Sequence, residues 1–344
     1  MILLSLVAHA AAAQAAGKSK PSALAPSQIV AAAPAKDWVA IPASDLLVMT
    51  LAPDAAGRPR RVVIQLIPAP FSQGWVRNIR KLAAAHWYDG ISVNRVQDNY
   101  VAQWGDATEK KPLPAGLETM PESAYETEVA RIVASDMGKD LTPEELRDLR
   151  DSIDAAKKVE VWKADVAGTQ TKDAPEGWHE RDSYAEFVEF HTGWPVASAG
   201  KQSSARFWPV HCYGMVGVGR DVSPSTGTSA ELYTVIGHAP RHLDRNIALV
   251  GRVIEGIEHL SSLPRGTEGL GFYKTPQERT PVVSIRLATE LPAAERPRFE
   301  YLSTESATFA RYADARANRK DEFFIRPAGG ADVCNIPVPV RRVP

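Results

Sequence analysis

The chain has 344 residues, of which 44% are hydrophobic and 24% are charged, as is usual for globular proteins. Forty basic against 41 acidic residues leave a net charge of −1, which argues against nucleic acid as the main partner because phosphate binding needs a basic surface. No run of eighteen or more apolar residues occurs beyond the N-terminus, so we expect no membrane span.

The first 16 residues are apolar and then small, and they end at an A-x-A-like cleavage site, Ala13-Gln14-Ala15. This pattern predicts a secretory signal, although the basic region that usually opens such a signal is missing. A disordered alanine-rich tail is the alternative. Residues 17–44 are interpreted as a linker, because their first part is rich in Ala, Pro, Ser and Lys. We therefore expect an exported protein, in the periplasm if the source is Gram-negative.

The first strand and the first helix of the main domain are predicted between residues 61 and 87. A β-branched segment at 61–67 indicates a strand, which Pro68 ends. Ser72 is placed to cap a helix whose apolar residues repeat at helical spacing.

A hairpin at 88–106 carries the residues that matter most for function. Two short strands flank a tight turn at Asp98-Asn99; the first carries Arg95 and the second Gln103, each among apolar neighbours. A fixed cation beside an amide and an apolar pocket suits the binding or isomerisation of a peptide bond.

The segment 107–205 differs in character from its surroundings. Helices are predicted at 125–137 and from Thr142-Pro143-Glu144-Glu145, a capping box with proline at the first helical position. A polar loop-like stretch covers 163–178, and an apolar pattern returns at 186–194. We interpret 107–205 as a helical insertion in a β domain.

The rest of the chain again favours β structure. Two helices are expected, at 254–263 and 305–317. The predicted strands are 211–220, 232–237, 247–253, 282–287 and 323–325. Several short strands with few helices favour a barrel or sandwich. We place the main domain at 45–290 and expect the C-terminal extension 291–344 to pack on it.

The chain contains two cysteines, Cys212 and Cys334. In an exported protein they could form one disulfide that pins the C-terminal region to the core. Two buried free thiols are the alternative. Two cysteines without paired histidines give no zinc-site spacing, and we expect neither a metal nor a cofactor.

Two blocks of sequence resemble the cyclophilins, the peptidyl-prolyl cis-trans isomerases. In 62–106, Val93-Asn94-Arg95-Val96 and Tyr100-Val101-Ala102-Gln103-Trp104-Gly105-Asp106 follow the family's arginine hairpin. In 214–263, Leu243-Asp244 and then Val250-Gly251-Arg252-Val253 follow its second motif. The resemblance implies an eight-stranded antiparallel barrel capped by two helices. It also implies X-Pro segments of unfolded or partly folded proteins as substrates, and we expect a monomer.

The same resemblance implies the site residues. Arg95 and Gln103 stand at the positions of the family's catalytic arginine and its glutamine. The substrate-binding positions are Tyr100, Val101, Gly219, Arg220, Leu232, Tyr233, His242 and Leu243. Several of these differ from the usual family residues, as do Ile247, where many members carry histidine, and Trp104, which replaces glycine and adds bulk beside the site.

Arginine suits this reaction because it stays charged and its fork is rigid. A guanidinium can donate a hydrogen bond to the proline nitrogen only when the amide is twisted, which lowers the barrier to rotation. We therefore predict a prolyl isomerase that assists the folding of exported proteins, with Arg95 stabilising the twisted amide. The alternative is a module that binds proline-containing segments with little turnover. In a third interpretation, the insertion docks a partner.

Overall fold

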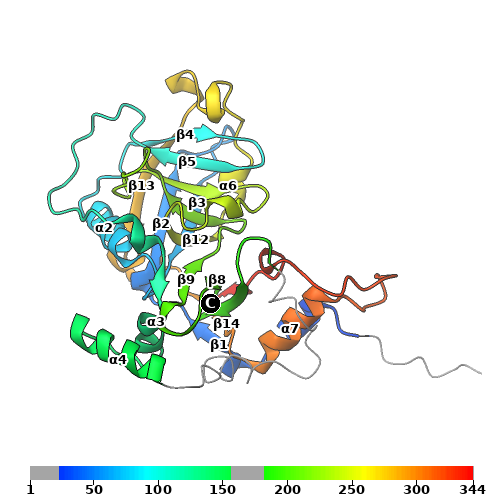
Figure 1. The fold of residues 1–344 in the computed structure, drawn as a ribbon. Helices are drawn as coiled ribbons and strands as arrows, with labels where there is room; N and C mark the ends of the chain where they lie inside the picture. The colour runs from blue at the N-terminus through cyan, green and yellow to red at the C-terminus, as the bar shows by residue number, and fades with distance from the viewer. Residues whose placement is uncertain (1–22, 156–181, 344) are drawn as a thin grey trace, which may run out of the picture.

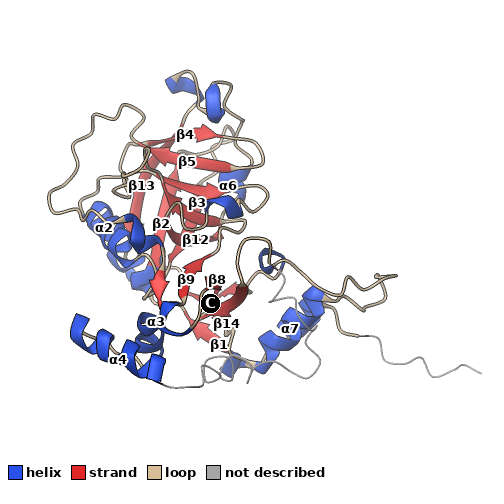
Figure 2. Ribbon diagram, viewed as in Figure 1, coloured by secondary structure: helices blue, strands red, loops and turns tan. Residues whose placement is uncertain are grey.

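The computed structural model describes residues 23–155 and 182–343 (Figure 1). The signal-like segment 1–16 and the polar stretch 163–178 lie outside the described residues. Eight antiparallel strands close into a barrel, which confirms the expected architecture (Figure 2). In order around the barrel they are β10 (Met215–Val218), β11 (Leu232–Val235), β5 (Val101–Gly105), β4 (Ser92–Val96), β13 (Thr280–Leu287), β2 (Leu46–Leu51), β3 (Arg60–Leu66) and β12 (Leu249–Glu255).

Successive side chains of a barrel strand point alternately into the barrel and away from it. On β2, Leu47 and Met49 belong to the main core. Their neighbours Leu46 and Val48 belong to a second buried cluster that includes Phe299 of the C-terminal extension. The outer face of this strand is therefore covered, which explains why every residue of β2 except Thr50 is apolar.

Two helices lie on the barrel, α2 (Gln73–Ala84) and the single turn α6 (Glu258–Ser261). Buried Trp75, Ile79 and Leu82 form the apolar face of α2, which contacts β12 and β13. The helix predicted at 254–263 is wrong in its first part, because β12 continues to Glu255 and pairs with β3 there. Pairing with a neighbouring strand outweighs the local helical pattern in this segment.

The insertion holds the expected helices, α3 (Val129–Asp136) and α4 (Pro143–Ala155). It also contributes to a four-stranded sheet, whose strands in order are β6 (Thr127–Glu128), β9 (Arg206–Pro209), β8 (Trp194–Ala199) and β7 (Phe187–His191). Thr192 and Gly193, with φ of 46° and 83°, form the two-residue turn between β7 and β8. This two-residue turn was not recognised from the sequence, and so the two strands that the turn joins were not predicted.

The described part of 17–44 is folded, so its interpretation as a linker is wrong from Pro26 onwards. It forms α1 (Pro26–Ala31) and β1 (Trp38–Ala40). In the C-terminal extension, β14 (Phe299–Leu302) lies between β1 and β15 (Val340–Arg342) in a small sheet, and α7 (Ala307–Ala317) contacts α1. Composition suggested a linker, but a few apolar side chains are enough to bind this segment: Ile29, Trp38 and Ile41 are all buried.

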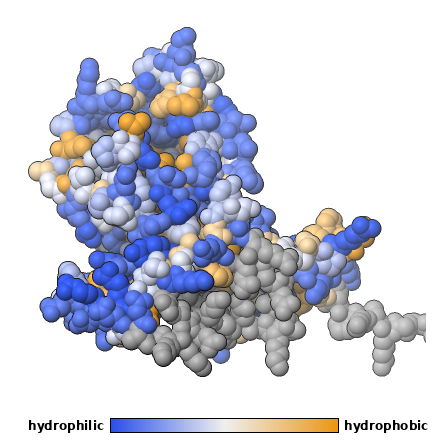
Figure 3. Space-filling model, viewed as in Figure 1, coloured by the Kyte–Doolittle hydropathy of each residue, from blue (hydrophilic) through white to orange (hydrophobic). Residues whose placement is uncertain are grey.

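The strand predicted at 323–325 is wrong, since these residues lie in the loop between α7 and β15. Phe323 is 83% and Ile325 95% exposed. The loop extends from the body of the molecule, and apolar surface is visible on it (Figure 3). Its aromatic and β-branched residues have the composition of a strand, but no neighbouring strand pairs with them in the described structure.

A disulfide joins Cys212, which follows β9, to Cys334 in the C-terminal extension, with the two Cα atoms 5.1 Å apart. The alternative of free thiols is therefore wrong. In the part of the chain that the structure covers, no helix has the length and apolar character needed to cross a bilayer.

Candidate active site

Arg95 and Gln103 lie opposite each other on the neighbouring strands β4 and β5. Arg95 Nη1 donates a hydrogen bond to Gln103 Oε1 at 3.0 Å. The strand register shifts between Val93 and Arg95, which marks a β-bulge. Bulges commonly redirect side chains next to active sites. The hairpin thus brings the predicted cation and amide into direct contact.

The Arg95 guanidinium is half-buried and held on several sides. It lies 5.7 Å from the centre of the Tyr100 ring and 5.5 Å from that of Phe272. Its Nε donates to the Leu270 carbonyl oxygen at 2.7 Å, and Nη2 donates to Gln97. Burial lowers the pKa of Arg95, and the nearby Tyr100 and Glu231 oppose only part of this shift. The cation is fixed in place before any ligand binds.

Glu231 orients Gln103 from the other side. Gln103 Nε2 donates to Glu231 Oε2 at 2.7 Å, so the Gln103 amide connects a carboxylate to the guanidinium. Burial raises the pKa of Glu231, and hydrogen bonds from Gln103 and Asn94 oppose this rise. Arg95, Gln103 and Glu231 thus form one polar network.

An apolar cluster lies next to this network. Buried Val101, Tyr233 and Val235 form it, with Tyr100, Leu243 and Ile247 packed against them. The sequence predicted four of these residues for the proline pocket, namely Tyr100, Val101, Tyr233 and Leu243. An apolar wall beside a fixed cation is the environment that a prolyl ring and its amide nitrogen require.

Two predicted site features are wrong. Leu232 is 1% exposed and belongs to the main core, whereas the next residue, Tyr233, belongs to the apolar cluster of the site. Trp104 is likewise fully buried in the main core and adds no bulk beside the site. Both follow from strand alternation, since neighbouring residues point to opposite faces.

Three further predicted residues lie at the rim of the site. A Cβ on Gly219 would lie 3.1 Å from Glu231 Oε2, which places Gly219 beside the polar network. The Arg220 side chain donates to the carbonyl oxygens of Asn246 and Asp221. Exposed His242 stacks on Tyr100 with ring centres 6.2 Å apart.

Sequence reasoning missed four residues around Arg95: Gln97, Glu231, Leu270 and Phe272. Leu270 acts through its backbone carbonyl, which has no sequence signature, and it is separated from Arg95 by 175 residues. Of these four, Glu231 could most readily have been recognised from the sequence, because it directly precedes Leu232 and Tyr233 in the second motif block.

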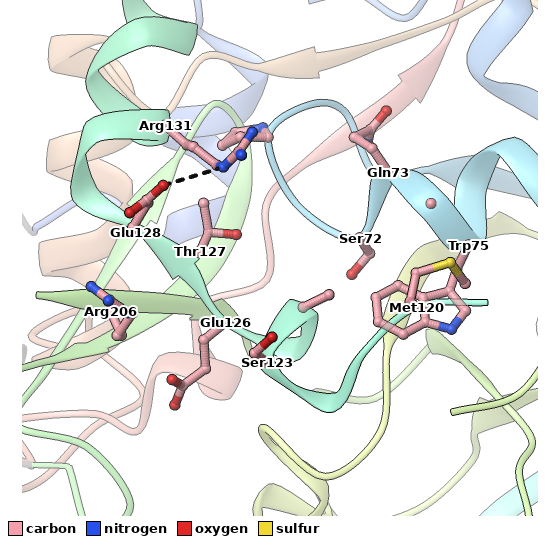
Figure 4. Close-up of a pocket in the computed structure, with 13 residues that line it drawn as sticks. Ser72, Gln73, Trp75, Met120, Ser123, Glu126, Thr127, Glu128, Arg131 and Arg206 are labelled. Atoms are coloured by element: carbon pink, nitrogen blue, oxygen red, sulfur yellow. Dashed lines mark ion pairs between the residues drawn. The ribbon is translucent and has the colours of Figure 1, made fainter. Parts of the chain in front are cut away.

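A separate hollow of about 390 Å³ lies between the start of α2 and the insertion (Figure 4). Hydroxyl groups of Ser72, Ser123 and Thr127 line it, together with the ion pair between Glu128 and Arg131. This lining is mostly polar, although Trp75 and Met120 contribute to it, so the hollow suits a prolyl ring less well. The apolar cluster next to Arg95 remains the candidate site.

Within residues 23–155 and 182–343, no group of three or more His, Cys, Asp or Glu side chains is arranged to hold a metal ion. The site offers hydrogen-bond donors and an apolar wall. These can bind a proline-containing segment and stabilise a change in its amide.

Comparisons with known proteins bear on the family and the fold of this chain. A family model, "Cyclophilin type peptidyl-prolyl cis-trans isomerase/CLD", matches residues 61–287, more than half of the chain. The structure of cyclophilin AquaCyp293 from Hirschia baltica is similar, with a TM-score of 0.59 and 21% identity, over 89% of this chain and 93% of that one. A cyclophilin type isomerase of Cryptosporidium parvum gives a TM-score of 0.34 and 10% identity, over 71% of this chain and 96% of its own.

The search of curated protein sequences found no match. The Hirschia baltica structure supports the fold, and the family model supports membership of the family. The closed barrel, the arginine hairpin and the family match lead to one conclusion. The chain belongs to the cyclophilin-type peptidyl-prolyl cis-trans isomerases.

Proposed function

We propose that the protein accelerates cis–trans exchange of X-Pro bonds in unfolded or partly folded exported proteins, with Arg95 stabilising the twisted amide. One observation carries this proposal: a guanidinium fixed between two rings borders an apolar cluster. The prolyl ring would contact Tyr233, Val101 and Leu243, and its nitrogen would face Arg95.

Rotation about a peptide bond has a barrier of about 18–20 kcal/mol because of amide resonance. Twisting the amide localises the lone pair on the prolyl nitrogen and makes that nitrogen a hydrogen-bond acceptor. Three of the five N–H groups of Arg95 donate to Leu270, Gln103 and Gln97. The remaining two have no partner among the described residues and can donate to the nitrogen. Because this bond exists only in the twisted state, it lowers the barrier.

Gln103 acts mainly on Arg95 in this proposal. Its carbonyl oxygen accepts from Arg95, and Glu231 holds its amide nitrogen. The second N–H of that amide has no described partner in the protein and can donate to a substrate carbonyl. Gln103 thus orients the guanidinium and contributes to substrate binding.

The decisive experiment is NMR exchange spectroscopy on an X-Pro peptide with and without the full chain. We expect Arg95→Ala to lower kcat/KM about a hundredfold, the typical loss when one preorganised donor is removed. Arg95→Lys should recover little, because an ammonium lacks the planar fork. Arg58→Ala is the matched control, since Arg58 pairs with Asp54 on the surface. An Arg95→Ala protein as active as the wild type would refute the assignment.

A binding module with little turnover is the second candidate. Ile247 favours it, because this apolar residue packs on the cluster where many family members carry histidine. The same NMR samples separate the two. A binder would shift the peptide signals on titration without adding exchange between the cis and trans forms.

The disulfide between Cys212 and Cys334 supports the proposed export, because such bonds persist mainly in oxidising compartments. Expression of the full chain with a C-terminal tag, followed by cell fractionation and thiol alkylation, tests this. We expect an exported protein without alkylable thiols. Recovery in the cytosolic fraction with both thiols reduced would contradict it.

A further inference from the structure

Tyr233 begins a chain of buried polar groups that leads away from the apolar cluster. Its hydroxyl oxygen lies 3.0 Å from His211 Nε2, and His211 Nδ1 lies 2.9 Å from Asp244 Oδ1. A carboxylate only accepts, so Nδ1 carries the proton toward Asp244. In the neutral ring, Nε2 then accepts from the Tyr233 hydroxyl. Burial raises the pKa of Tyr233, which keeps it a donor.

The series of hydrogen-bonded polar groups continues from Asp244 to the insertion. Arg241 Nε donates to Asp244 Oδ2 at 2.6 Å, and its two terminal nitrogens donate to Asp182 at 2.7 and 2.9 Å. The side chains of His211, Asp244, Arg241 and Asp182 are between 1% and 4% exposed. We call the series Tyr233, His211, Asp244, Arg241 and Asp182 the Tyr233 relay.

Both additions to the barrel meet at this relay. Asp182 belongs to the insertion, and His211 directly precedes Cys212, whose disulfide fixes the C-terminal extension. Asp332 of that extension comes within 4.0 Å of Arg241. The position of Tyr233 is thereby linked to segments outside the barrel.

Gly217 on β10 faces the same ring. A Cβ on Gly217 would lie 2.3 Å from both the hydroxyl oxygen and Cζ of Tyr233, closer than any real Cβ contact. The end of the Tyr233 ring therefore occupies the space that a side chain on Gly217 would need. Any larger residue at 217 must displace the Tyr233 ring.

Stability alone is a poor explanation for this arrangement. Desolvation offsets most of the attraction within a buried ion pair, so such pairs contribute little net stability. A fully hydrogen-bonded buried network does fix the orientation of its members. In this relay, the side chain at the end of the network forms a wall of the candidate proline pocket.

We propose that the Tyr233 relay and Gly217 together set the depth of the proline pocket. In this proposal, His211 and Asp182 are positioning residues, and Tyr233 with Gly217 selects the size of the substrate ring. The inference rests on the proposed isomerase function and deepens it. The ligand class is a five-membered prolyl ring, discriminated from a six-membered one.

The test compares two peptides that differ only in having proline or pipecolic acid, which has one more ring methylene. One methylene in an apolar pocket is worth about tenfold or more in kcat/KM. We expect the wild type to prefer proline by about that factor. Tyr233→Phe and Asp182→Asn should raise KM for the proline peptide and reduce this preference at least about threefold, because the ring can then retreat from the pocket.

Gly217→Ala tests the opposite movement. It should lower kcat/KM about tenfold for the proline peptide and more for the pipecolyl peptide. Adding Tyr233→Phe to the same protein should restore part of this loss. Asp45→Asn is the matched control, because Asp45 also pairs with an arginine, Arg80, but lies outside the relay. It should leave the preference unchanged. Thermal unfolding of every variant identifies those that are folded; Tyr233→Phe keeps the ring, so we expect it to fold.

The outcomes separate the two proposals. An active wild type whose preference is unchanged in folded Tyr233→Phe and Asp182→Asn overturns the relay and leaves the isomerase function standing. An equal loss on both peptides indicates a merely structural role and also overturns the relay. A wild type that accelerates neither peptide overturns both proposals.

Discussion

At the scale of single residues, Glu231, which directly precedes β11, differs most from an ordinary exposed carboxyl group. It is partly buried, and it accepts a hydrogen bond from Gln103, which in turn accepts one from Arg95. Burial raises its pKa. The native protein therefore holds a proton on this carboxyl at pH values where the unfolded chain has released it. This part of the stability is complete below the ordinary pKa and is lost as pH rises through the raised one.

Two substitutions separate the hydrogen bond of Glu231 from its charge. Glu231→Gln keeps an acceptor for Gln103 and removes the titration, so we expect kcat/KM at pH 7 within about threefold of wild type and a flatter pH profile. Glu231→Leu leaves the Gln103 amide without that acceptor, and we expect about a tenfold loss. Isomerisation rates between pH 5 and 8 provide the measurement. Equal losses in both variants would show that the charge matters and the hydrogen bond does not.

At the scale of elements, the polar side chains of the β4–β5 hairpin are hydrogen-bonded to one another, whereas the sheet of the insertion carries a buried carboxyl oxygen without a partner in the described structure. The bulge between Val93 and Arg95 lets consecutive residues serve one network, since Asn94 bonds Glu231 and Arg95 bonds Gln103. In the insertion, β7 carries Glu189, whose Oε1 is buried without a hydrogen-bond partner in the described structure. Burial, with nearby Asp136, raises the pKa of Glu189 to about 8.

Glu189 should make stability depend on pH. Its native pKa of about 8 exceeds the ordinary value of 4.5, so its contribution is complete below pH 4.5 and is lost as pH rises to 8. We expect the free energy of unfolding to fall by about 2–4 kcal/mol across this window from this group. Glu189→Gln should abolish this part of the dependence of the free energy of unfolding on pH. Urea unfolding of both proteins at pH 5, 6.5 and 8 measures these free energies. An equal fall with pH in the wild type and in Glu189→Gln would contradict the assignment.

At the scale of the whole molecule, the segments flanking the barrel form a second layer around it. β1 from the N-terminal side pairs with β14 from the C-terminal side, and Phe299 of β14 packs on the outer face of the barrel. The disulfide fixes this layer beside the Tyr233 relay. The additions are therefore integral to the domain that carries the site.

Removing the disulfide should weaken the molecule measurably. Its cysteines are 122 residues apart, so it restricts a long loop of the unfolded chain. We expect Cys212→Ser combined with Cys334→Ser to lower the free energy of unfolding by about 2–4 kcal/mol. Denaturant unfolding of wild type with and without dithiothreitol is the control and should show the same loss. Unchanged stability in both cases would mean that the C-terminal extension is held by packing alone.

The sequence by itself predicted a β barrel or sandwich, and only the resemblance to the cyclophilins implied the closed barrel. The hairpin pattern predicted the pair Arg95 and Gln103. The pair depends on local information: a turn at Asp98-Asn99 sets the register of a hairpin, and that register places the two side chains opposite each other. The two cysteines could likewise be read as a candidate pair. Composition misled for 17–44 and for 323–325, because local preference does not reveal whether a packing or pairing partner exists.

Only the tertiary structure decided what surrounds the pair. Leu232 and Tyr233 are neighbours in sequence, and barrel closure fixed which of them faces the site. The Leu270 carbonyl that holds Arg95 is a backbone group, which every residue carries. The Tyr233 relay joins residues from 182 to 244, and its hydrogen bonds exist only once the insertion has folded against the barrel. Contacts over such separations depend on the path of the whole chain, which no local pattern records.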